Sequence, residues 1–157
     1  MTYKITQYQT RKTRMIELSL SADQTISVGG IVLFDTIRAS HAGHGVSLSS
    51  GIIQLDQTRN YWMQASMDVT RASYASDVEF TFYNASGTAM TAAEGAFPAV
   101  WQYHTPSPAG GRANATYTAT YVSTGTTESA VSLRASLIFP ASTINSQGFK
   151  ILIVEVE

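Results

Sequence analysis

The chain has 157 residues, a formal net charge of −1 and no cysteine. This length fits one domain that can bury a core without covalent cross-links, and the lack of cysteine excludes disulfides and thiolate metal sites. The net charge of −1 predicts neither a nucleic-acid-binding surface nor a membrane-binding surface. Only 13% of the residues are charged, about half the usual share, which suits β structure and extensive protein–protein contact.

The first predicted segment is a polar arm over residues 1–14. It contains four cations and no acidic residue: Lys4, Arg11, Lys12 and Arg14. The arm lacks the apolar run of a signal peptide, and no stretch of the chain has the roughly 20 apolar residues needed to span a bilayer. Two interpretations stay open. The arm is either a solvated tail that pairs with Glu155 and Glu157, or an anchor that docks on an acidic partner.

A single β-rich domain is predicted over residues 15–157. The expected strands lie near residues 15–20, 26–28, 31–37, 46–55, 60–70, 77–83, 115–122, 130–139 and 149–156. The alternation is clearest over 60–70, where Met63 is predicted to face the core and Trp62 the opposite side. Turn residues separate the strands, which favours an all-β sandwich. The segment 88–101 stays ambiguous, because a short helical turn there would have to end before Pro98.

The central stretch resembles the C1q/tumour-necrosis-factor-like jelly roll. The resembling positions are Phe34, the turn at Gly45 and Val46, "SGII" over 50–53, "RNYWM" over 59–63, and the final "GFKILIVEVE". The chain departs from the family pattern at Ser40, at Arg59, and at Met63 and Ala65. The resemblance implies a β-sandwich with jelly-roll strand order that assembles as a homotrimer.

The cysteine-free composition, rich in Ser, Thr and Ala, looks like bacteriophage versions of this fold. Phages use such trimers as capsid decoration (cement) proteins and as knobs of head or tail fibres. The resemblance therefore implies a structural virion protein, made in the host cytoplasm, whose partner is the major capsid protein or another virion protein. The alternative is a receptor-binding fibre knob that recognises a bacterial surface glycan or protein. A third interpretation is a bacterial C1q-like recognition module, for which an export signal is expected.

No catalytic, metal or cofactor site is predicted. His41 and His44 lie three residues apart in "SHAGHGVS", but Asp35 and Asp56 are expected on strands outside that loop. These histidines and His104 are therefore predicted to be ordinary surface residues. No nucleophile motif, phosphate-binding loop or dinucleotide fingerprint occurs, so an enzyme is not predicted.

Three aromatic residues are the candidates for a trimer interface: Trp62, Tyr117 and Tyr121. Tyrosine suits a subunit contact because its ring packs while its hydroxyl still finds a partner. An ordinary intramolecular core is the other interpretation of these positions. A carbohydrate-stacking platform made of Trp101 and Tyr103 is a further alternative.

Overall fold

The computed structural model describes residues 14–70, 78–90, 99–101, 112–123, 130–138 and 142–156. These residues form twelve strands and no helix that could cross a membrane. The strands are β1 (Arg14–Ser19), β2 (Gln24–Ile26), β3 (Thr36–Ala39), β4 (Val46–Ser49), β5 (Ile52–Leu55), β6 (Asn60–Thr70), β7 (Val78–Tyr83), β8 (Ala99–Trp101), β9 (Arg112–Ser123), β10 (Ala130–Ile138), β11 (Ser142–Ile144) and β12 (Lys150–Val156).

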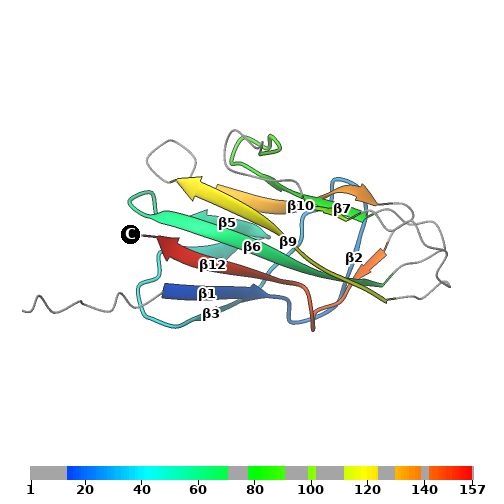
Figure 1. Cartoon of the computed structure of the whole chain (residues 1–157), viewed down its shortest axis with the longest axis horizontal. Coiled ribbons are helices and arrows are strands. Elements are labelled where there is room, and N and C mark those ends of the chain that lie inside the picture. The colour runs from blue at the N-terminus through cyan, green and yellow to red at the C-terminus, as the bar shows by residue number, and fades with distance from the viewer. Residues whose placement is uncertain are drawn as a thin grey trace, which may run out of the picture.

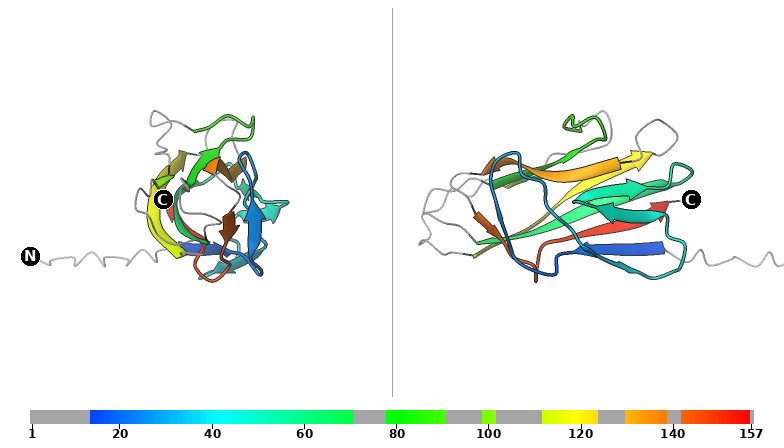
Figure 2. Two further views of the ribbon diagram at one scale, coloured as in Figure 1. Left: turned by 90° about the vertical axis from the view of Figure 1, so that its right-hand side faces the viewer. Right: turned by 180° about the vertical axis from the view of Figure 1, so that it is seen from behind.

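The strands form two antiparallel sheets that face each other as a sandwich (Figures 1 and 2). One sheet has seven strands in the order β2-β11-β6-β12-β1-β3, with β9 paired to β6, and the other has five in the order β4-β5-β10-β7-β8. The last strand, β12, lies between β1 and β6. The prediction of a jelly-roll β-sandwich is confirmed.

The core lies between the two sheets and follows the period of two in the sequence. On β6, the side chains of Tyr61, Met63 and Ala65 are fully buried, whereas Trp62 between them is only partly buried. This confirms the predicted phase of the strand and places Met63 in the core. Phe149 joins the two layers, with its ring centroid 5.0 Å from that of Phe80.

Several predicted strands differ in detail from the observed ones. The stretch 46–55 is a hairpin, β4 and β5, that turns at Ser50 and Gly51 with φ values of 50° and 77°, as a two-residue turn of type I′ requires. The expected strand over 31–37 is only an isolated bridge at Ile31 followed by β3. Residues 29–32 instead run beside β10, where Val32 N–H donates to the Leu133 carbonyl at 2.9 Å. Residues 99–101 form β8, and β11 was not predicted because three residues are too few to show a period.

Candidate functional site

The outer face of the seven-stranded sheet carries a row of apolar side chains across adjacent strands. Met15 on β1 lies opposite Val154 on β12, which lies opposite Trp62 on β6. Met15 is 45% exposed, and Val154 and Trp62 are partly exposed. Directly paired residues in a sheet project to the same face, so these side chains form a continuous stripe. We call Met15, Val154 and Trp62 the apolar row.

Charged groups border the apolar row on the same face. Glu17, two residues along β1 from Met15, pairs with Lys150 at 3.3 Å and with Arg38 at 3.9 Å. The Arg38 side chain is 74% exposed. An apolar stripe beside solvated ion pairs has the arrangement of a subunit interface, in which an apolar centre is surrounded by a polar rim.

The pairing of β6 with β9 gives the backbone positions of the three predicted interface aromatics. Trp62 lies on the apolar row, and the backbone position opposite it on β9 is Tyr121. A register shift separates the Gln64 pair from the Ser66 pair, so one extra residue of β9 is accommodated near Tyr117. The period of two along β9 is interrupted between Tyr117 and Tyr121, so the sequence alternation alone does not predict that they project to the same face. The side chains of these two tyrosines lie outside the described residues, as does Tyr103.

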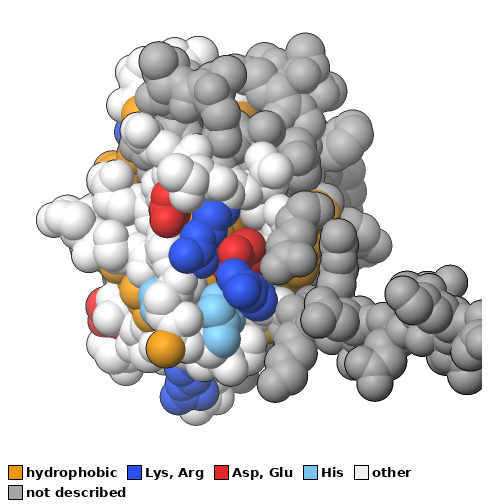
Figure 3. All heavy atoms as spheres, turned by 90° about the vertical axis from the view of Figure 1, so that its left-hand side faces the viewer, with side chains coloured by type: hydrophobic (Ala, Val, Ile, Leu, Met, Phe, Trp, Pro, Cys, Tyr) orange, Lys and Arg blue, Asp and Glu red, His pale blue; other side chains and the backbone are white. Residues whose placement is uncertain are grey.

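The root of the arm is held by a buried carboxylate at one end of the sandwich. The guanidinium of Arg14 lies 2.8 Å from Oε1 of Glu155, and that of Arg59 lies 3.0 Å from Oε2. The Glu155 side chain is only 5% exposed, because it shares a register position with buried Tyr61 on the core side of the sheet. Figure 3 shows Lys or Arg, Asp or Glu, and His side chains gathered at this end. We call Arg14, Arg59 and Glu155 the arm clamp.

The histidine loop packs against the arm clamp. The Nε2 atom of His41 lies 3.5 Å from Glu155 Oε2, is buried, and makes no hydrogen bond within the described residues. His44 accepts a hydrogen bond from the Val46 N–H through Nδ1 at 3.2 Å. Arg59 also donates to the Gly43 carbonyl at 2.8 Å, so one guanidinium ties this loop to the last strand.

Tyr61 and Asp56 complete this end of the molecule. The Tyr61 hydroxyl lies 3.3 Å from the His44 carbonyl and 3.4 Å from the Gly45 carbonyl, and burial raises its pKa. Asp56 follows β5, and its N–H donates to the Gly45 carbonyl at 2.8 Å. Hydrogen bonds from the backbone and then the side chain of Thr58 lower the pKa of Asp56, with a smaller contribution from the positive charge of Arg59.

These contacts correct two expectations about the histidines. His41 and His44 are partly buried rather than ordinary surface residues. A carboxylate does lie beside them, because the fold brings Glu155 against His41 and Asp56 against Gly45. The described residues contain no group of three or more His, Cys, Asp or Glu side chains that could hold a metal. His104 lies outside the described residues.

Of the four predicted docking cations, the structure describes one. Arg14 is the first residue of β1 and is engaged by Glu155, as the tail interpretation anticipated for that acidic residue. Lys4, Arg11 and Lys12 lie outside the described residues. Arg59 was not among the predicted site residues, because nothing local in the sequence relates it to Arg14.

Comparison with known proteins supports the fold alone. No family model matches the chain, and no curated protein matches it. Two crystal structures of murine APRIL, determined at pH 8.0 and pH 8.5, are similar to it, with TM-scores of 0.57 and 0.55 and sequence identities of 9% and 11%. Each match covers 92% of this chain and 100% of the other. The chain therefore has a fold of the C1q/tumour-necrosis-factor-like type, in agreement with the resemblance in its sequence.

Proposed function

We propose that the chain is a structural virion protein of a bacteriophage, a homotrimer that caps or cements the capsid. The observation that carries self-association is the apolar row on the outer face of the seven-stranded sheet, and the virion role follows from the phage-like composition of the chain. Its partly exposed Met15, Val154 and Trp62 side chains suit burial by a second copy of the chain. The C1q/tumour-necrosis-factor-like fold supports a trimer as the closed assembly. The proposed role is assembly rather than catalysis.

The arm gives the trimer its attachment to the capsid. The arm clamp ties Arg14 to Glu155, so the docking cations in this proposal are Lys4, Arg11 and Lys12. Exposed charges act over a Debye length of about 8 Å at physiological salt, so they would speed and orient docking more than they strengthen it. The lasting contact with the capsid protein would come from apolar and strand-edge surfaces.

Light scattering tests the trimer. The intact chain is expected to give about three times the monomer mass of 17.0 kDa. Trp62→Lys places a charge on the apolar row and is expected to give monomers with an unchanged circular dichroism spectrum. Leu33→Lys is the matched control, because Leu33 is 49% exposed but lies away from the row. A monomeric wild-type chain, or a Trp62→Lys protein that remains trimeric, would contradict the proposal.

Particle binding tests the attachment. Removing residues 1–13 leaves the arm clamp intact and is expected to yield a folded trimer that no longer decorates capsids. High salt is expected to slow capture of the intact chain without releasing molecules already bound. Electron microscopy of the decorated particle separates the two virion roles: density on the shell supports the cement protein, whereas density at a fibre tip supports the receptor-binding knob.

A further inference from the structure

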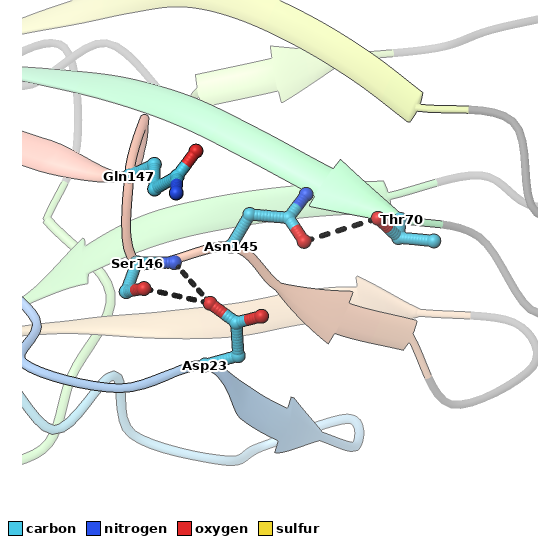
Figure 4. Close-up of a pocket in the computed structure, with 5 residues that line it drawn as sticks. All are labelled: Asp23, Thr70, Asn145, Ser146 and Gln147. Carbon is cyan, nitrogen blue, oxygen red and sulfur yellow. Dashed lines mark hydrogen bonds between the residues drawn. The ribbon is translucent and has the colours of Figure 1, made fainter.

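The end of the sandwich opposite the arm clamp carries a polar pocket of about 440 Å³. The described residues that line it are Asp23, Thr70, Asn145, Ser146 and Gln147. They come from the approach to β2, the end of β6 and the turn after β11 (Figure 4). Thr70 is the last residue of β6 and Asn60, beside the C-terminal end of β12, is the first. A strand of this length places the two ends about 30 Å apart.

The wall formed by Asp23 and Ser146 is held by two hydrogen bonds. The Ser146 N–H and hydroxyl both donate to Oδ1 of Asp23, each at 2.7 Å. These bonds join two segments that lie 123 residues apart in the sequence. The carboxylate is therefore fixed at the edge of the pocket while Asp23 stays exposed to solvent.

The opposite wall is fixed by Asn145, which is 8% exposed. Its Oδ1 accepts a hydrogen bond from the Thr70 hydroxyl at 3.0 Å, and its Nδ2 donates to Oδ1 of buried Asp68 at 2.7 Å. The backbone N–H of Asn145 also donates to the Asp68 carbonyl at 2.8 Å. A side chain held at both ends of its amide is pre-organised, which lowers the entropy cost of binding a ligand.

Gln147 supplies an amide that is available to a ligand. Its side chain is exposed, and it makes no hydrogen bond to another described residue. The Gln147 carboxamide offers two donors and one acceptor group. It can therefore reach a hydroxyl-rich molecule without first breaking a contact inside the protein.

We propose that this pocket binds a neutral sugar unit of a glycan. Every lining side chain among the described residues carries a hydroxyl, a carboxamide or a carboxylate, and the volume lies in the range of small-molecule sites. Sugar hydroxyls both donate and accept hydrogen bonds, so they match this mixture of groups. The described lining includes no cation that would pair with an anionic ligand and no apolar side chain that would contact a hydrophobic one.

The pocket lies at the end of the sandwich opposite the arm clamp, which suits recognition of a glycan on a surface that faces the particle. The arm clamp and the C-terminal end of β12 lie at one end of the sandwich, and β2 and β11 lie at the other (Figure 1). A trimer attached through its arms would present the pockets away from the capsid. This orientation rests on the proposed function, whereas sugar binding by the pocket does not.

Saturation-transfer NMR on the intact chain tests the site, with the methyl α-glycosides of glucose, galactose and mannose and with N-acetylglucosamine as the probes. At least one probe is expected to receive saturation at millimolar concentration in a buffer that contains EDTA. Gln147→Ala and Asp23→Asn are expected to weaken its binding roughly tenfold or more. Gln54→Ala is the control, because Gln54 is an exposed glutamine on β5, outside the pocket.

Three results would overturn the proposal. The first is the absence of binding by all four probes. The second is equal binding by the wild type and Gln147→Ala when thermal melting shows both to be folded. The third is binding of Ca²⁺ or Mg²⁺ to the pocket in the absence of sugar, measured by titration calorimetry. Light scattering on the same samples reports the oligomeric state separately, so a failure of the trimer and a failure of the sugar site are distinguished.

Discussion

Arg14 and Glu155 occupy directly opposed positions on β1 and β12, and their side chains meet at 2.8 Å. The contact joins the root of the basic arm to the last strand, 141 residues later. Arg59 approaches the second oxygen of the same carboxylate from the turn after β5. One buried acidic group thus holds three parts of the chain at one end of the sandwich.

Replacing Glu155 with Gln is expected to destabilise the domain. The substitution keeps the shape of the side chain but removes the negative charge that Arg14 and Arg59 share. Hydrogen bonds to charged groups contribute about 1.5–3 kcal/mol each, and the partial exposure of both arginines places the expected loss of unfolding free energy at about 1–3 kcal/mol. Urea denaturation measures it.

Arg38→Gln is the matched control for the arm clamp. Arg38 reaches Glu17 only at 3.9 Å and its side chain is 74% exposed, so its removal is expected to change stability by less than about 1 kcal/mol. Equal losses for Glu155→Gln and Arg38→Gln would show that the arm clamp does not stabilise this end of the sandwich.

Met63→Ala tests the core assignment of β6. The Met63 side chain is fully buried, so truncation is expected to cost about 2–5 kcal/mol. Val28→Ala provides the comparison, because Val28 is 58% exposed and little burial is lost there. Thermal unfolding of the two variants is the measurement, and an unchanged melting temperature for Met63→Ala would contradict the packing of the strand.

Gly45→Ala is expected to destabilise the domain more than Gly43→Ala. Both glycines adopt a left-handed φ, of 66° and 68°, which costs a residue with a Cβ about 1–2 kcal/mol. A Cβ at Gly43 would meet no atom within 4 Å, whereas one at Gly45 would lie 2.6 Å from the Tyr61 hydroxyl and 2.7 Å from Asp56 Cβ. The crowding adds about 1–3 kcal/mol at Gly45 alone. Chemical denaturation of the two variants checks the order, and equal losses would contradict it.

The stabilisation by Asp35 is expected to be lost in acid. The hydroxyl of Ser21 donates to this carboxylate and lowers its pKa below the usual value of 3.8, and the Ser21 N–H donates to it at 2.9 Å. A carboxyl group whose pKa is lowered by folding stabilises the protein above its unfolded pKa and loses that contribution as the pH falls through its folded pKa.

The test compares the melting temperatures of the wild type and Ser21→Ala as the pH is lowered. Ser21→Ala is expected to melt at a lower temperature at neutral pH, and the difference is expected to shrink as the pH falls below about 4. A difference that stays constant down to strongly acidic pH would show that the hydroxyl acts independently of the charge on Asp35.

The sequence by itself determined the fold class and the core of β6. A period of two is a local property, so the alternation around Met63 predicted both the strand and its buried face. The same reasoning placed Trp62 on the opposite face. The tertiary structure decided that this face also carries Met15 and Val154, because the register of β1, β12 and β6 brings the three residues into one row.

Only the tertiary structure could assemble the arm clamp and the polar pocket. Pairing of the arm with Glu155 was only one of two interpretations of the sequence, and His41 and Arg59 reach the same carboxylate from two further segments that no local pattern relates to it. Asp23 and Ser146 meet across 123 residues, after β2 and β11 have paired at the far end of the sandwich. Local patterns report which face of a strand is buried, whereas contacts between distant side chains depend on strand order and register, which packing of the whole chain decides.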